Sequence, residues 1–152
     1  MIRSIPTILL SAVIGCAISE ETTVDIQGPQ RGDDGIETWT ITSPYTLGTN
    51  ALRVLLPDGF DATRPRGVLY VLPVGGEPDG DHGDGLREVR AADAHNRHDL
   101  ICVTMAFGSV PWYGSHESDP AIRHDEYLLK VILPHIESRY GASTKAADRL
   151  LF

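Results

Sequence analysis

The stretch that decides the fold is GVLYVLPV at residues 67–74, which runs directly into GGEP at 75–78. A continuous apolar run of this length is typical of a strand covered on both faces, as in a parallel sheet. The paired glycines that follow it indicate a backbone turn at the mouth of that strand. The stretch therefore predicts a central strand of an α/β domain, with a loop leaving its carboxyl end.

Further strands extend this sheet in both directions along the chain. DLICVTMAF at 99–107 is a second buried run, and DRLLF at 148–152 begins a third apolar strand. Upstream, ETWTITS at 37–43 alternates like a half-exposed strand, and ALRVLLPDGF at 51–60 is a strand stopped by a turn. Helical segments between them predict a three-layer α/β sandwich with a mostly parallel sheet. Since a domain rarely ends inside a buried run, we expect the sheet to be incomplete at the C-terminus.

Two helical segments are expected to cover the sheet. Residues 86–98 have helical spacing, and a longer helix begins with Asp119 as N-cap and Pro120 in its first turn. Pro134 lies inside this helix and should kink it, while Gly141 suits its C-terminal end. The apolar face of the long helix consists of Leu128, Leu129, Ile132, Ile136 and Tyr140.

Charge and cysteine content exclude several classes of function. With 21 acidic and 13 basic residues in 152, the formal charge is 13 − 21 = −8, which argues against a nucleic-acid partner. The cysteines are Cys16 and Cys102, so no disulfide framework is expected. Cys102 lies in an apolar run and is interpreted as a small buried hydrophobe rather than a nucleophile.

The N-terminus differs in composition from the rest of the chain. Residues 1–19 have a basic start and an apolar segment too short to span a bilayer, which predicts an export signal. Small residues before Cys16 are similar to a bacterial lipobox, which makes Cys16 a lipidation candidate; an ordinary secretory cleavage near residues 17–20 is the alternative. The expected location is periplasmic, extracellular or lipid-anchored at the cell envelope. A polar linker over 20–37 would then precede a domain over 38–152.

The loop after the run at 67–74 is the first candidate site, because ligands of open α/β sheets bind at the carboxyl ends of the strands. Gly75 and Gly76 would let a carbonyl oxygen approach backbone N–H donors, as an oxyanion hole requires. The alternative is a glycine turn needed for geometry alone. The acidic residues at 79–84 do not fit the calcium-loop pattern and predict a solvated acidic loop, so no metal or cofactor is expected.

The loop over 108–120 is the second candidate site. It leaves the carboxyl end of the strand at 99–107 and carries Trp112, Tyr113 and His116. The two aromatic side chains would either line a substrate pocket or cover the sheet, and His116 is the histidine that we expect nearest a ligand.

The order of these pieces resembles the esterase D-like group of α/β-hydrolases over roughly residues 40–152. LRVLLPDGFDATRPRGVLYVLPVGGEP resembles the early strands and glycine-rich oxyanion loop of that group, and DLICVTMAF its next strand. DEYLLKVILPHIESRYGAS, with a proline inside its helix, is the most specific stretch. The usual His-Gly of the oxyanion loop is replaced by Pro73-Val74, which weakens this part of the likeness.

The resemblance implies a serine esterase whose Gly-x-Ser-x-Gly motif directly follows the strand that begins with DRLLF. It places Gly75, Gly76 and Glu77 in the oxyanion loop and assigns no catalytic residue within the 152 residues, so this chain alone is predicted to be inactive. The expected partner is a small-molecule ester, and membrane contact is expected only through a lipid on Cys16. The rival hypothesis is a non-catalytic, secreted or lipid-anchored binding module that uses the loop at 108–120.

Overall fold

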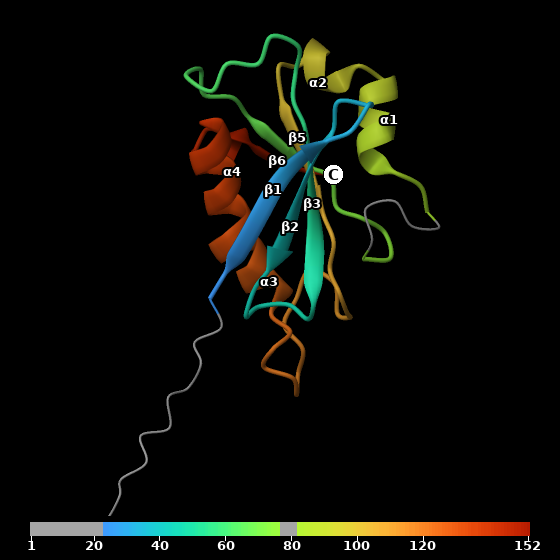
Figure 1. Cartoon of the computed structure of the whole chain (residues 1–152), viewed down its shortest axis with the longest axis vertical. Coiled ribbons are helices and arrows are strands. Elements are labelled where there is room, and N and C mark those ends of the chain that lie inside the picture. The colour runs from blue at the N-terminus through green and yellow to red at the C-terminus, as the bar shows by residue number, and fades with distance from the viewer. Residues whose placement is uncertain (1–22, 77–81) are drawn as a thin grey trace, which may run out of the picture.

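The structure is a computed structural model that describes residues 23–76 and 82–152, and its elements form a six-stranded sheet with helices on both faces (Figure 1). The strands lie in the order β1-β2-β3-β5-β4-β6. Their bounds are β1 (Asp25–Arg31), β2 (Glu37–Thr42), β3 (Thr49–Leu55), β4 (Val68–Tyr70), β5 (Ile101–Met105) and β6 (Arg149–Leu151).

The sheet is mixed, and the prediction of a mostly parallel sheet is wrong. Neighbours from β1 to β5 pair antiparallel, whereas β4 runs parallel to both β5 and β6. A short connection explains the antiparallel pairing of β2 with β3, because the loop between them spans only residues 43–48. A parallel crossover needs about a dozen residues or more, so a loop this short joins antiparallel neighbours.

Strand β1 lies within the stretch predicted as a linker, so the prediction of a linker over 20–37 is wrong for residues 25–31. The strand pairs with β2 from Asp25 opposite Thr42 to Arg31 opposite Glu37, with a register shift between Gln27 and Gln30. An edge strand gains its stability from one hydrogen-bonded ladder and faces water elsewhere. Its polar, glycine-containing sequence therefore looks like a loop.

Strand β6 confirms the predicted strand near residue 148, but it is not buried. It pairs in parallel with β4, and Phe152 continues the ladder by donating its N–H to the carbonyl of Tyr70 at 3.0 Å. The strand forms the edge of the sheet, so Leu151 is 63% and Phe152 is 81% exposed.

Helices cover the two faces of the sheet and make it the middle of three layers (Figure 1). One face packs against α3 (His124–Tyr127), the π-helical segment η1 (Leu128–Ile132) and α4 (Leu133–Tyr140). The other face packs against α1 (Gly85–Ala91) and α2 (Ala94–Arg97), and a short 3₁₀ turn, η2 (Ala146–Asp148), precedes β6.

The long helix differs from its prediction at both its start and its proline. Asp119 caps a separate turn by accepting from the N–H of Ala121 at 3.0 Å, and helix α3 begins at His124. The π-helical segment η1 directly precedes Pro134, and the extra residue of a π turn relieves the clash of the proline ring with the carbonyl four residues earlier. A kink at this proline stays a prediction. Gly141 ends α4 in the left-handed region, as predicted.

The predicted export signal at 1–19, with Cys16, lies outside the described residues, and so does Glu77. Across 23–76 and 82–152, no helix has the combined length and apolar character needed to cross a membrane.

Candidate functional site

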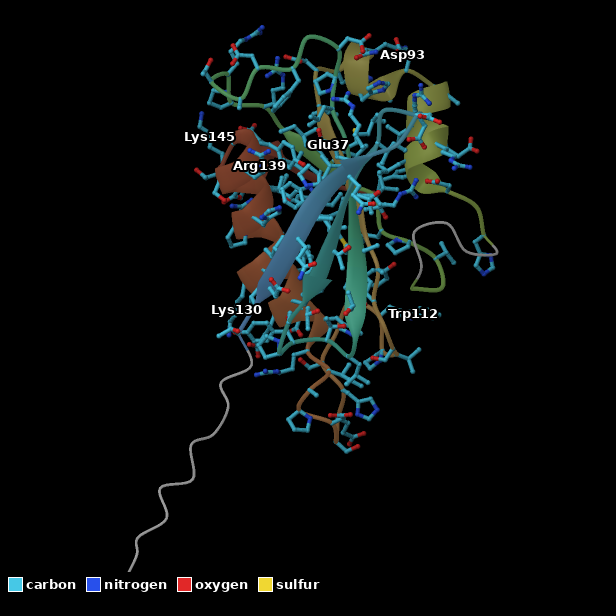
Figure 2. The ribbon with its side chains drawn as sticks, viewed as in Figure 1. Glu37, Asp93, Trp112, Lys130, Arg139 and Lys145 are labelled. Atoms are coloured by element: carbon cyan, nitrogen blue, oxygen red, sulfur yellow. The ribbon has the colours of Figure 1, made fainter. Side chains whose placement is uncertain are left out.

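The candidate site lies where the carboxyl ends of β4, β5 and β6 meet. These strands are parallel, so the segments that leave β4 and β5 emerge at the same edge of the sheet. The first segment carries the glycine pair, and the second carries the aromatic residues at 112 and 113. Trp112 accordingly lies at the end of the sheet opposite Asp93 and α2 (Figure 2).

Gly75 and Gly76 form the bend that follows β4, and each needs to be glycine. Val74 and Gly75 lie in a turn, and the φ angles of Gly75 and Gly76 are +89° and +84°, values that L side chains rarely adopt. A Cβ on Gly76 would also lie 2.7 Å from Nε1 of Trp112 and 2.9 Å from the carbonyl oxygen of Phe107. The bend thus requires glycine for its backbone conformation and, at Gly76, for the close approach of Trp112 and Phe107. The approach of a ligand carbonyl to this pair stays a prediction.

A backbone hydrogen bond joins this bend to the end of β5. The carbonyl of Gly76 accepts from the N–H of Phe107 at 2.7 Å. The bend is therefore tied to the segment that follows β5 rather than held only by its own turn.

The second segment folds back onto the glycine bend. Trp112 lies over Gly76, and the hydroxyl of Tyr113 donates to the carbonyl of Pro73. The Tyr113 ring packs edge-on against Phe107, with 5.1 Å between ring centroids, and partial burial raises the pKa of Tyr113. Trp112 and Tyr113 are each 41% exposed, so one side of this aromatic pair packs on the protein and the other faces solvent. We call these two residues the aromatic wall.

His116 has a local bonding role. Its Nδ1 accepts from the N–H groups of Ser118 at 3.2 Å and of Asp119 at 3.0 Å, so the ring caps the turn that follows it. A part in ligand binding stays a prediction for this residue.

A cavity of about 230 Å³ opens beside the glycine bend. Its walls include His82 and Thr104, which the sequence did not single out. Phe152 also lines it, so the end of β6 reaches the same place as the loop after β4. Its lining residues are Val71, Leu72, Pro73, Val74, His82, Gly83, Gly85, Thr104 and Phe152.

Asp84 closes the loop that begins at the glycine bend, and the expectation of a solvated acidic loop is wrong for this residue. Its carboxylate accepts from the N–H groups of Leu86 at 3.1 Å and Arg87 at 3.2 Å, which caps α1. It also forms an ion pair of 2.9 Å with Arg53 of β3, and its side chain is only 9% exposed. In the described part of the chain, no three acidic, histidine or cysteine side chains gather as a metal site would need.

This edge of the sheet brings together the glycine bend, the aromatic wall that packs on it, and a cavity lined by Val74, the residue before the bend. Binding of a carbonyl oxygen by backbone N–H groups of the bend stays a prediction.

Comparisons with known proteins support the fold assignment. No family model and no curated protein matches the chain. Among solved structures, it is similar to a ferulic acid esterase with 22% identity and a TM-score of 0.55, over 76% of this chain and 46% of that one. It is also similar to a CE1 ferulic acid esterase from the anaerobic fungus Anaeromyces mucronatus, with 16% identity and a TM-score of 0.50, over 88% of this chain and 50% of that one. The chain thus spans about half the length of these enzymes and shares the fold of that part.

Proposed function

We propose that the chain is the N-terminal part of an exported serine carboxylic-ester hydrolase, with its oxyanion loop at Gly75, Gly76 and Glu77. The observation that carries this proposal is the glycine bend at the carboxyl end of β4. It combines left-handed glycines, a bond to the end of β5 and an adjoining cavity. The fold shared with two ferulic acid esterases supports it.

The nucleophile in this proposal is a serine shortly after Phe152. The resemblance to esterase D-like hydrolases implies a Gly-x-Ser-x-Gly motif there, and the cavity that Phe152 lines is the place such a serine would enter. Val74, which directly precedes the glycine pair, also lines this cavity. We therefore assign the nucleophile, its acid and its histidine to sequence beyond residue 152.

The reaction then follows the acyl-enzyme route. The serine oxygen attacks the ester carbonyl carbon while a histidine takes the hydroxyl proton, and backbone N–H groups of the bend stabilise the negative charge on the carbonyl oxygen. The carbon–oxygen bond to the alcohol breaks, and the alcohol leaves with the proton from the histidine. Water then repeats the attack on the acyl-enzyme, which releases the acid and restores the serine.

Export is part of the proposal. The basic and apolar pattern of residues 1–19 supports secretion, and Cys16 is the proposed attachment point if the protein is lipid-anchored.

Hydrolysis of p-nitrophenyl acetate tests the proposed function with two proteins. We expect no turnover above a heat-denatured control from the 152-residue chain, and turnover from the product of the gene read past residue 152. Replacing the serine of the expected motif with alanine should abolish that turnover. Turnover by the 152-residue chain, or an extended reading frame without the motif, would refute the proposal.

A stop codon directly after residue 152 would favour the rival function, a binding module that uses the loop at 108–120. In that case the 152-residue protein should be a soluble monomer that unfolds cooperatively.

A further inference from the structure

His124 ties three separate segments together beneath the aromatic wall. Its Nδ1 lies 3.0 Å from the carbonyl oxygen of Pro111, in the segment that carries the wall. Its Nε2 lies 3.2 Å from the hydroxyl of Thr46, in the loop between β2 and β3. The ring itself belongs to the first residue of α3 and is completely buried.

The partners of the ring fix its tautomer. A carbonyl oxygen only accepts, so Nδ1 must carry the hydrogen that is donated to Pro111. Nε2 is then an acceptor and receives the hydroxyl hydrogen of Thr46. Thr46 in turn accepts from Nδ2 of Asn50 at 3.4 Å. A directed chain of hydrogen bonds therefore runs from Asn50 of β3 through a neutral histidine to Pro111, the residue before the aromatic wall.

Packing joins the same ring to the wall by a second route. Phe107 lies between His124 and Tyr113, with centroid distances of 5.0 Å and 5.1 Å. Pro111 directly precedes Trp112, which lies on Gly76. Movement at the imidazole would consequently reach both residues of the wall.

We propose that His124 is a positioning residue, a latch that holds the aromatic wall against the glycine bend while its ring is neutral and releases it when the ring gains a second proton. The second proton would enter at Nε2, where Thr46 now donates. The Thr46 hydroxyl could turn to accept it, so a lost hydrogen bond is not what opens the latch. The cause is a positive charge in a completely buried ring.

The surroundings of His124 offer little to balance that charge. The partners of its ring on other segments are Thr46, Pro111 and Phe107, all uncharged, and its backbone N–H donates to the carbonyl of Gly114 at 3.1 Å. The carboxylate that acts on the ring is Asp125 of its own helix, which is already bonded to the hydroxyl of Ser115. Burial is the largest influence and lowers the pKa of His124, while the Pro111 carbonyl and Asp125 oppose it. The latch is thus closed at neutral pH and opens in acid.

The consequence for a substrate rests on the proposed function, but the latch itself can be tested without any substrate. The protein contains two tryptophans, Trp39 and Trp112. With 5-fluorotryptophan incorporated, each should give its own fluorine resonance, assigned with a Trp112→Phe variant. Trp39 is 6% exposed and packs under α4, so its resonance monitors the core.

Acid titration of the wild-type chain is the main experiment. Between the ordinary pKa of histidine and the lowered value in the closed state, the opening equilibrium should rise about tenfold per pH unit. We expect the Trp112 resonance to move toward its solvent-exposed value while that of Trp39 stays away from its value in the urea-unfolded chain. A small shift of Trp39 will accompany protonation of His135, whose ring lies edge-on to it at 4.6 Å. An unmoved Trp112 resonance while His124 titrates would overturn the proposal, and so would movement of both resonances to their unfolded values, which indicates global unfolding.

Three variants separate His124 from the other histidine of the segment. His124→Asn keeps a donor for Pro111 but cannot titrate, so Trp112 should stay closed at every pH. His124→Ala should leave it open even at neutral pH. In His116→Asn, an amide oxygen replaces the ring nitrogen that caps its turn, and the wild-type transition should persist. Loss of the transition in His116→Asn, or its survival in His124→Asn, would assign the switch elsewhere.

Discussion

Replacing Gly76 with alanine should destabilise the fold by considerably more than the same replacement at a glycine that has room for a side chain. At Gly76 the new Cβ meets both Nε1 of Trp112 and the carbonyl oxygen of Phe107. Gly48 is the matched control, because its φ angle is +64° and no atom lies within 4 Å of a Cβ built there. Both alanines suffer the left-handed backbone, and both gain equally from a less flexible unfolded chain.

The difference in free energy of unfolding between the two variants measures the cost of the contact with Trp112 and Phe107. Left-handed strain costs roughly 1–2 kcal/mol at either site. At Gly76 the displaced neighbours add the weakened hydrogen bond to Phe107, roughly 0.5–1.5 kcal/mol, together with packing of Trp112. We therefore expect a loss of about 2–4 kcal/mol for Gly76→Ala and about 1–2 kcal/mol for Gly48→Ala.

Urea denaturation measures both variants. With a slope of about 2 kcal/mol/M, the midpoint of Gly76→Ala should lie roughly 0.5–1 M below that of Gly48→Ala. Equal midpoints would show that Trp112 and Phe107 yield without cost, and the inference of a tightly fixed bend would then be wrong.

Further predictions concern the rest of the domain. A Cβ on Gly141 would collide with the backbone carbonyl of Ala62, so Gly141→Ala should cost about 3 kcal/mol and lower the melting temperature by roughly 6–12 °C; an unchanged melting curve would contradict this. Tyr140→Phe leaves the buried N–H of Trp39 without its 2.8 Å acceptor and should cost about 1–3 kcal/mol by urea denaturation, whereas a loss near zero would refute that bond's role. Because burial depresses the folded pKa of His124 below its ordinary value of 6.5, its stabilising contribution is complete above pH 6.5 and is lost as the pH falls through the folded pKa. Stability measured against pH should accordingly fall less steeply in acid for His124→Asn than for the wild-type chain, and identical curves would contradict this.

The parts of the fold that the sequence predicted are those with their own local signal. The apolar runs at 67–74 and 99–107 contain β4 and β5, and a lone glycine at the end of a helical pattern marked Gly141 as the end of α4. Strand direction has no such signal, because an apolar run reads the same in a parallel and an antiparallel pair. Strand β1 was missed because its stability comes from a backbone ladder with β2 rather than from its side chains.

In the candidate site too, only the features with a local sequence signal could be predicted. Gly75, Gly76 and Trp112 were singled out because glycine pairs and aromatic loops at strand ends are visible in sequence, and the structure brings Trp112 against Gly76. Their part in binding a ligand stays a prediction. The hydrogen-bond partners of His116 and His124 were not predicted, because six histidines look alike until the chain is folded. The partner of His124, Thr46, lies 78 residues away along the chain, so no local pattern could identify it.

The two borders of the sheet differ in how they would receive another strand. On the β1 side, polar residues, a register shift between Gln27 and Gln30, and Pro29, which has no N–H to donate, all discourage the addition of a strand. On the β6 side, Leu151 and Phe152 offer water an apolar surface along an open ladder. An added strand, whether from continuing sequence, a second molecule or a peptide, should therefore pair with the β6 edge. Self-association of the isolated protein will depend on how well that edge is covered.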